Sequence, residues 1–273
     1  IIGLIVVRPV SGVNLDGADA QGQEIRHPAI QHRIILMLCS ESVDNLRTAK
    51  GKIDLQEDVN TYLKEFKIPA TYPQPITMLD LMSHTAGLGE TGAGDATYNA
   101  AELISLGAYL TRYMPPLVYP PGQIPAYSNY GATLAGHIVE QVSGEPYDQY
   151  IEEHILKPLG MTHSSMRQPL PADLAAAISQ SYTFNGEFQN LPFLFLQVSP
   201  AGSLSASGAD IGKFMLAHLQ GGKYNGGSIL EPETVRLMHS QSYTFDPALT
   251  GIAHGFAEWM INGRRLIGHG GHI

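Results

Sequence analysis

The chain has 273 residues, of which 44% are apolar and 15% charged, enough to bury the core of one large domain or two small ones. The low charged fraction argues against disorder, and the formal net charge of −9 argues against a nucleic-acid-binding surface, which is usually basic. The single cysteine, Cys39, excludes an intrachain disulfide and a cysteine-based metal site, and no apolar run reaches the roughly 18 residues of a membrane-spanning helix.

The amino-terminal region carries the weakest structural signals. The opening IIGLIVV predicts a buried strand. It has no starting methionine, basic leader or cleavage site, so the chain is expected to begin, and likewise to end, inside a longer gene product. Residues 11–33 are polar and loop-like, and the apolar residues of 35–50 cluster at one end instead of recurring along a helical face.

Two helices are predicted in the next part of the chain. Residues 76–84, ITMLDLMSH, predict a short helix with Thr77 near its start. Residues 99–114, NAAELISLGAYLTRYM, predict a second helix that Pro115 and Pro116 stop.

The clearest helix signal follows residues 120–131, PPGQIPAYSNYG. Ser128 is the expected N-cap, and Gly144 ends the run. Apolar side chains recur four apart on one face: Tyr130, Leu134, Ile138 and Val142. Further helices are predicted over residues 145–156, 208–222 and 232–241.

The carboxy-terminal end changes character. Asn262-Gly263 stands between two runs of alternating apolar residues, which predicts a two-residue hairpin. Helices in the middle and strands at both ends predict an α+β fold. We expect a single domain, 1–273, in which both chain ends build one antiparallel sheet with flanking helices around an inserted, mainly helical lobe. Its parts are 1–50, 51–205 and 206–273.

Two short motifs carry a family resemblance. AYSNYG, residues 126–131, is similar to the Tyr-x-Asn element of the serine beta-lactamase and penicillin-binding-protein superfamily, and GHGG, residues 268–271, resembles the His-x-Gly variant of its Lys-Thr-Gly element. The stretches GKIDLQEDVNTYLKEFKIP, ITMLDLMSHTAGL and SPAGSLSASGADIGKFMLAHLQGG resemble the class C, DD-peptidase and esterase branch. The resemblance runs from about residue 51 to the last residue. It implies a beta-lactamase-like fold, an α/β sandwich that is truncated at its C-terminus, because family members continue past this second motif.

The resemblance implies a site for acyl transfer, in which a serine attacks a carbonyl and N–H groups hold the oxyanion. Tyr127 is then the residue on the side of the base, Asn129 orients a substrate amide or carbonyl, and Ser128 lies with them on the substrate side. On its own, a Tyr-Ser-Asn triplet before a helix is more often a cap with a packed tyrosine, and only the flanking matches favour the site.

The resemblance implies that the second motif, GHGG, forms the opposite wall of the substrate cleft. The resemblance implies that His269 takes part in catalysis, that Gly270 and Gly271 bind substrate, and that the backbone N–H of His272 is an oxyanion donor. A plain turn, or a metal motif formed by His269 and His272, are the alternatives. The resemblance implies neither a metal nor a cofactor. His84, in SHTAGL, matches a structural stretch of the family, which predicts a buried, hydrogen-bonded histidine.

The nucleophile element of the family, Ser-x-x-Lys, is absent: no serine of the chain has a lysine three positions on. Its expected place is near Ile34 and Met37, and residues 34–50 are interpreted as a local frameshift or a chimeric join. Cys39 or Ser42 could replace the serine, although neither has a lysine at the right spacing.

The sequence therefore predicts a beta-lactamase-like serine hydrolase for ester, amide or D-amino-acid peptide substrates, impaired by the missing motif. A non-catalytic protein that binds a ligand or partner, and an inactive gene fragment, are the alternatives. No nucleic-acid partner and no membrane segment within the chain are expected. Export or membrane attachment is implied by the resemblance only, and the sequence leaves the oligomeric state open.

Overall fold

The computed structural model describes residues 2–3, 30–31 and 52–270. The predictions for residues 34–50, Gly271 and His272 lie outside the described residues. The α-helices of the described residues are α2 (Met78–Met82), α3 (Leu106–Arg112), α4 (Asn129–Ser143), α5 (Tyr147–Ile151), α6 (Ala172–Ala175), α7 (Ser199–Gly202), α8 (Gly208–Leu219) and α9 (Pro232–His239), and a π-helix, Glu152–Leu156, continues α5. The strands are β1 (Ile2–Gly3), β2 (Ile30–Gln31), β3 (Ala96–Thr97), β4 (Ser164–Ser165), β5 (Ser181–Phe184), β6 (Phe188–Leu191), β7 (Phe195–Leu196), β8 (Ser205–Ala206), β9 (Lys223–Tyr224), β10 (Gly227–Ser228), β11 (Ala257–Ile261) and β12 (Arg264–Gly268).

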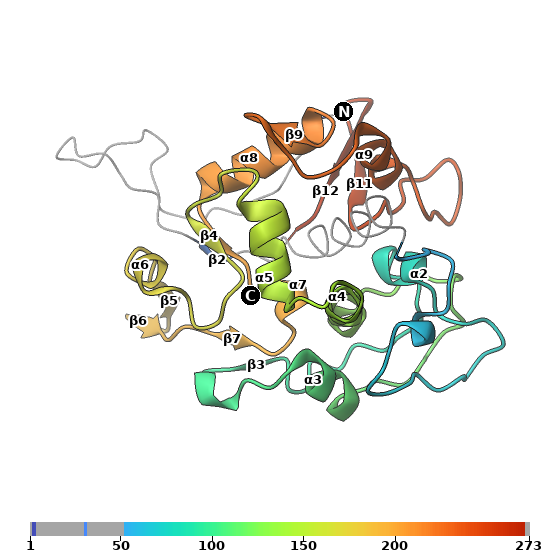
Figure 1. Ribbon diagram of the computed structural model, residues 1–273, viewed down its shortest axis with the longest axis horizontal. Coiled ribbons are helices and arrows are strands. Elements are labelled where there is room, and N and C mark those ends of the chain that lie inside the picture. Colours follow the sequence, from blue (N-terminus) through green and yellow to red (C-terminus); the bar gives the residue numbers. More distant parts are fainter. Residues whose placement is uncertain (1, 4–29, 32–51, 271–273) are drawn as a thin grey trace.

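Helix α4 lies at the centre of the helical part, with α2, α3, α5 and α7 around it (Figure 1). Its start is fixed by Ser128, whose Oγ accepts the Gly131 N–H at 3.0 Å, as the sequence predicts. Its end is fixed by Gly144, which takes the left-handed conformation at φ 80°. Because every residue from Asn129 to Val139 is buried, α4 positions whatever directly precedes it against the core.

The predicted helix over residues 76–84 is confirmed as α2. Thr77 and Asp80 form a reciprocal capping box, in which each side chain accepts the backbone N–H of the other residue.

The predicted helix over residues 99–114 is wrong in its extent. The chain instead forms a 3-10 turn, Ala100–Glu102, an extended break, and then α3. Ser105 accepts the Ala108 N–H at 3.2 Å and acts as a second N-cap in the middle of the predicted helix. A serine side chain that competes for backbone N–H groups explains the break.

The predicted sheet from both chain ends is present, in the order β1-β12-β11. β11 and β12 form an antiparallel hairpin whose turn residues, Asn262 and Gly263, have φ values of 51° and 71°. Two positive φ values match the type I′ turn that the Asn-Gly pair predicts. β1 pairs with β12 in parallel, so the sheet is not antiparallel throughout. No tight turn joins β1 to β12, so chain connection does not impose an antiparallel direction there.

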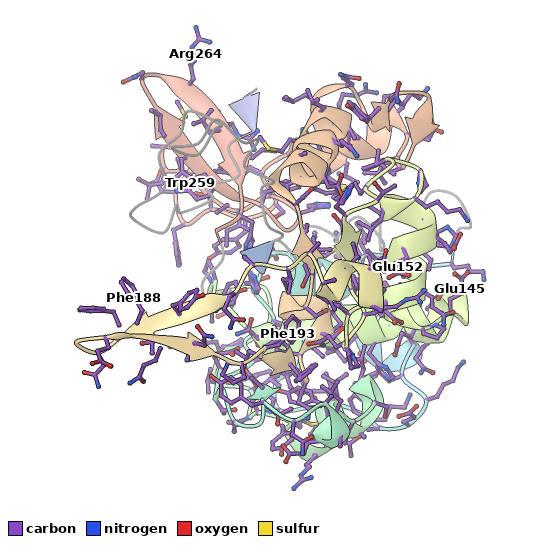
Figure 2. All side chains as sticks on the ribbon, turned by 90° about the vertical axis from the view of Figure 1, so that its left-hand side faces the viewer. Glu145, Glu152, Phe188, Phe193, Trp259 and Arg264 are labelled. Atoms are coloured by element: carbon purple, nitrogen blue, oxygen red, sulfur yellow. The ribbon has the colours of Figure 1, made fainter. Side chains whose placement is uncertain are left out.

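A second hairpin, β5–β6, projects from the body of the molecule and carries the labelled Phe188 (Figure 2). The register pairs Tyr182 with Asn190 and Phe184 with Phe188, so the three aromatic rings share one face. All three are largely exposed. Elsewhere, none of the helices among the described residues is long and apolar enough to cross a bilayer.

Candidate active site

Tyr127 and His269 lie next to each other although they come from opposite halves of the chain. Tyr127 stands two residues before α4, and His269 directly follows β12. Their ring centroids are 6.0 Å apart, and the ring planes are inclined by 46°. Tyr127 is 45% exposed, so the two rings meet at the surface, where a small molecule can reach the phenol.

His84 supports Tyr127 from the interior side. The imidazole of His84 is buried and lies 4.2 Å from the Tyr127 ring, centroid to centroid. Its Nδ1 accepts the Ser128 N–H at 3.2 Å, and its backbone carbonyl accepts the Ala126 N–H at 2.7 Å. The prediction of a buried, hydrogen-bonded histidine is confirmed. His84 thus fixes the backbone on both sides of Tyr127.

The protonation state of His84 follows from its surroundings. Burial, and then the positive charge that His269 can carry, lower the pKa of His84 to about 3. The ring is therefore neutral near pH 7, and a neutral ring whose Nδ1 accepts a hydrogen bond carries its proton on Nε2. In addition, His84 has φ 55°, a conformation that costs a non-glycine residue about 1 kcal/mol or more and that the surrounding bonds must hold in place.

Asn129 is held from the other side by Glu90. The Asn129 backbone N–H donates to Glu90 Oε2 at 2.7 Å, and Asn129 Nδ2 donates to Glu90 Oε1 at 2.9 Å. The carboxylate accepts only, so it fixes which end of the Asn129 amide is the nitrogen. Asn129 is 8% exposed, and no donor among the described residues lies within hydrogen-bond distance of its Oδ1. We refer to His84, Glu90, Tyr127, Asn129 and His269 as the tyrosine–histidine cluster.

Sequence reasoning missed Glu90. Glu90 lies in a loop, 39 positions before its partner Asn129, and no local pattern links the two. The loop itself carries a signal. Gly87 has φ 74°, and a Cβ atom at this position would lie 2.0 Å from the Tyr119 carbonyl oxygen, so only glycine fits. This close approach sets the path of the chain just before Glu90.

The remaining predicted residues are placed as follows. The Ser128 side chain is 3% exposed and serves as the α4 cap, so its hydroxyl points into the helix start instead of toward solvent. Gly270 is exposed, and a Cβ atom there would meet no atom of the described residues within 4 Å beyond its chain neighbours. Gly271 and His272 lie outside the described residues.

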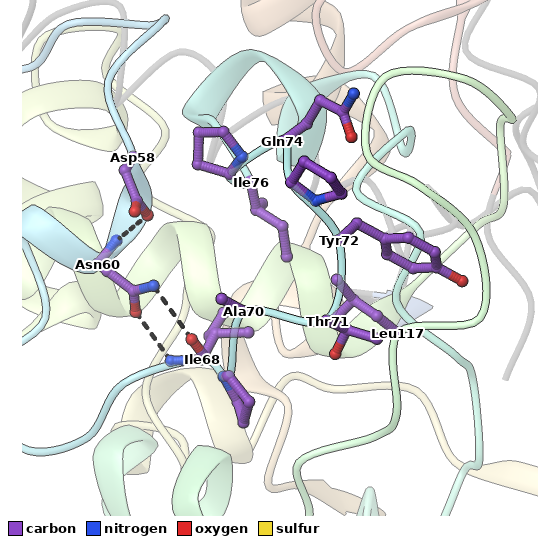
Figure 3. A pocket seen from close by; sticks show the side chains of 12 residues that line it. Asp58, Asn60, Ile68, Ala70, Thr71, Tyr72, Gln74, Ile76 and Leu117 are labelled. Atoms are coloured by element: carbon purple, nitrogen blue, oxygen red, sulfur yellow. Dashed lines mark hydrogen bonds between the residues drawn. The ribbon is translucent and has the colours of Figure 1, made fainter.

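A separate pocket of about 170 Å³ lies between residues 58–76 and Leu117 (Figure 3). None of the predicted site residues lines it. One of its polar side chains, Asn60, is already paired, because Nδ2 donates to the Ile68 carbonyl at 3.1 Å and Oδ1 accepts the Ile68 N–H at 2.8 Å. Across the described part of the chain, no three His, Cys, Asp or Glu side chains gather as a metal site.

Comparison with known proteins places the chain in a family. The family model described as beta-lactamase matches residues 46–273. PbpX of Bacillus subtilis (strain 168), which carries a penicillin-binding-protein name, is 30% identical over 178 residues, or 64% of this chain and 42% of PbpX. An N-acetylmuramyl-L-alanine amidase of the same organism is 29% identical over 234 residues, or 73% of this chain and 51% of the amidase. The chain therefore spans about half the length, or less, of these curated relatives.

Solved structures share the fold. A D-stereospecific amidohydrolase from Streptomyces sp. superposes with a TM-score of 0.74 at 21% identity, over 90% of this chain and 76% of that one. An octameric penicillin-binding protein homologue from Pyrococcus abyssi gives a TM-score of 0.73 at 21% identity, over 88% of this chain and 56% of that one. The fold is thus beta-lactamase-like, and the chain belongs to the beta-lactamase family of hydrolases.

Proposed function

We propose that the tyrosine–histidine cluster is the acyl-transfer site of a serine hydrolase for small amides, esters or peptides. We further propose that this chain turns such substrates over only weakly, because it lacks Ser-x-x-Lys. The observation that carries the proposal is the contact between Tyr127 and His269, whose ring centroids lie 6.0 Å apart at the surface.

The chemistry follows from the residues present. We expect a bound substrate carbonyl to lie next to the Tyr127 phenol and, on its other side, next to the end of β12 at His269. The phenol can exchange a proton with an attacking hydroxyl or with the leaving group. Asn129 Nδ2 keeps one N–H beyond the bond to Glu90, and this donor can orient a substrate carbonyl. Backbone N–H groups after His269 are the proposed oxyanion donors.

Relatives support the class of substrate. The similar proteins include an N-acetylmuramyl-L-alanine amidase and a D-stereospecific amidohydrolase, and both names denote hydrolysis at an amide. Attack at such a carbonyl needs an activated nucleophile. Removing the nucleophile of a serine hydrolase lowers turnover by roughly a million-fold, and binding and the oxyanion site leave a residual of about a thousand-fold over water. We therefore expect this chain to bind acyl compounds better than it converts them.

The test restores the missing motif. The double substitution Ile34→Ser/Met37→Lys writes Ser-x-x-Lys at its expected place, and Ile34→Ser alone is the matched control without the lysine. A fluorophosphonate probe and a labelled penicillin report covalent adducts, and a nitrophenyl ester reports turnover. The unchanged chain and the single variant should stay near background, whereas the double variant should form adducts.

Two results would contradict the proposal. A folded double variant that forms no adduct would speak against an acyl-transfer site. An unchanged chain that already forms a stable adduct and turns over the ester rapidly would refute the proposed impairment.

A second candidate function is binding of an acyl compound without chemistry. Asn129 Oδ1 favours it: within residues 52–270 this buried acceptor has no donor, which is costly, and a bound ligand can supply one. Saturable, non-covalent binding by the unchanged chain, together with an inert double variant, would favour this second function.

A further inference from the structure

The β5–β6 hairpin is a projecting sheet without a third strand. Among the described residues, β5 pairs with β6 alone, and β6 pairs with β5 alone. Figure 2 shows the hairpin standing out from the body of the molecule, with Phe188 on it. Every residue of β5 and three of the four residues of β6 are exposed. A two-stranded hairpin is only marginally stable by itself in water, so this one calls for a further strand or a cover.

One face of the hairpin is aromatic. Tyr182, Phe184 and Phe188 share this face, and they are 55%, 66% and 77% exposed. The ring centroids of Phe184 and Phe188 are 5.1 Å apart, and those of Tyr182 and Phe188 are 6.5 Å apart. An aromatic side chain has about 200 Å² to bury, so the three rings together expose about 400 Å². An apolar patch of this size on a monomer often marks an interaction site.

Charge is nearly absent from this part of the chain. The formal net charge of the whole chain is −9, yet from residue 174 to residue 209 the only charged side chain is Glu187. Glu187 lies in the turn between β5 and β6, so neither strand carries a charge. Two copies of an acidic chain repel each other, and an uncharged surface is where they can approach most closely. The aromatic face is therefore suited to a second copy of the same chain.

The outer edge of β5 is suited to strand pairing. β5, Ser181–Phe184, contains neither a proline nor a charged residue, which are the features that protect natural edge strands. By contrast, Pro192 directly follows β6 and removes a backbone donor there. A bilayer does not suit the β5 edge, because open sheet edges do not occur in the hydrocarbon region of a membrane. A strand of another protein molecule supplies the backbone bonds that a bilayer cannot.

We propose that β5 pairs with β5 of a second copy of this chain across a two-fold axis, which forms a four-stranded antiparallel sheet. One register pairs Thr183 with Thr183 of the second copy and keeps all the aromatic rings on one face. Tyr182 then lies opposite Phe184 of the second copy, and symmetry repeats this pair. Thr–Thr and aromatic–aromatic pairs are both favourable across strands. The two Glu187 side chains fall at opposite ends of the sheet, about 14 Å or more apart, which exceeds the Debye length of about 8 Å.

The available area predicts a weak dimer. A standard protein interface buries about 800 Å² on each partner, and the three aromatic rings supply about half of that area. Interfaces of about 1,600 Å² in total have affinities from micromolar to picomolar, so a smaller interface should have a dissociation constant above about 1 µM. The dimer should therefore form in concentrated solution and dissociate on dilution.

Sedimentation velocity of the unchanged chain, at concentrations from about 1 µM upward, measures this equilibrium. We expect a sedimentation coefficient that rises with concentration toward that of a dimer. Phe184→Ser should raise the dissociation constant at least about tenfold, because each dimer loses two aromatic pairs. Phe245→Ser is the matched control: Phe245 is 70% exposed but lies outside the hairpin, and its replacement should leave the equilibrium unchanged.

A pair of charge variants separates strand pairing from any effect on the hairpin itself. Thr183→Lys places two like charges opposite each other at the two-fold axis, and Thr183→Glu does the same with the other sign. Each variant alone should raise the dissociation constant about fivefold or more. An equimolar mixture of the two variants should restore the dimer, because opposite charges then face each other across the axis.

An unchanged chain that stays monomeric at every concentration would overturn the proposal. So would a dimer that Phe184→Ser leaves intact, or a mixture of the charge variants that associates no better than either variant alone. Flotation with phosphatidylcholine vesicles tests the bilayer as the other occupant. Vesicle binding that Phe184→Ser abolishes, in a chain that forms no dimer, would assign the aromatic face to a membrane instead.

Discussion

The rings of His84 and Tyr127 lie 4.2 Å apart, and the backbone on either side of Tyr127 bonds to His84. A buried residue at the end of α2 thus determines where a half-exposed phenol stands at the start of α4. His269 then meets the other side of the same phenol at 6.0 Å. The position of Tyr127 is therefore fixed by His84 and His269, two residues that are distant from it in the sequence.

Replacing His84 should destabilise the protein. His84→Ala removes the acceptor of the buried Ser128 N–H, and leaving such a donor unsatisfied costs about 1–3 kcal/mol. Urea denaturation measures the change in the free energy of unfolding. His163→Ala is the matched control, because the His163 side chain is exposed, and it should stay within about 0.5 kcal/mol. Equal effects of the two substitutions would argue against the role assigned to His84.

The same substitution should have opposite effects in two helices. In α4, a Cβ atom at Gly136 would lie 2.4 Å from two side-chain carbons of Pro200. Gly136→Ala should therefore cost about 1–3 kcal/mol through overpacking. In α8, a Cβ atom at Gly212 meets nothing within 4 Å, so Gly212→Ala should stabilise by about 0.5–1 kcal/mol. Thermal denaturation gives both signs, and a stabilising Gly136→Ala would refute the packing of α4 on α7.

Stability should fall on mild acidification. Burial, and then His269, lower the pKa of His84 to about 3, and burial, followed by His218 and Arg265, lowers the pKa of His239 to about 4. Between these lowered pKa values and the ordinary value of 6.5, both histidines are protonated in the unfolded chain but neutral in the folded chain. The two neutral histidines therefore make their full contribution to the free energy of unfolding above about pH 6.5, and this contribution is lost as the pH falls toward their lowered pKa values.

The loss should reach up to about 1.4 kcal/mol per pH unit for each histidine. Urea titrations at pH 7, 6 and 5 measure the slope, and this range lies above the usual titration of carboxylates. His239→Gln should make the slope shallower whatever its effect on absolute stability. An unchanged free energy of unfolding between pH 7 and 5 would contradict the neutral, buried state of both rings.

The hairpin that leads to His269 contains an ion pair between the half-buried Arg265 and the buried Glu258. Arg265 donates to the Glu258 carboxylate through Nε, at 3.0 Å, and through Nη2. Burial raises the pKa of Glu258, but the bonds from Arg265, the Gly251 N–H and Gln241 outweigh it, so the net shift is downward. Arg265→Ala leaves this carboxylate without its cation and should cost about 3 kcal/mol. The neighbouring Arg264 is exposed, and Arg264→Ala should cost little; similar losses for both would count against the pair.

Local signals made much of the fold predictable. Ser128 and Gly144 fix the two ends of α4, and Asn262-Gly263 fixes the β11–β12 turn, because each acts within a few residues of itself. Asn185-Gly186 is a similar sequence signal and could have revealed the β5–β6 hairpin, which the sequence interpretation missed, although this loop spans residues 185–187 and Gly186, not Asn185, takes the positive φ. The break at Ser105 was missed because apolar periodicity hid a cap inside the predicted helix.

The site was less accessible to sequence reasoning. Tyr127, Asn129 and His269 could be selected only through the family resemblance, since a triplet before a helix and a histidine beside glycines are ordinary features. Glu90 could not be found, because its bond to Asn129 depends on the path of a loop that closes over a long stretch of chain. The catalytic roles of these residues stay predictions.

The contact between Tyr127 and His269 is tested most directly by nuclear Overhauser effects between tyrosine and histidine ring protons in a selectively labelled, otherwise deuterated protein. We predict a cross-peak between the two rings that disappears in both Tyr127→Phe and His269→Gln. The His84–Tyr127 cross-peak, from rings 4.2 Å apart, is the internal control. Observation of the control peak without any peak from Tyr127 to His269 would contradict the account.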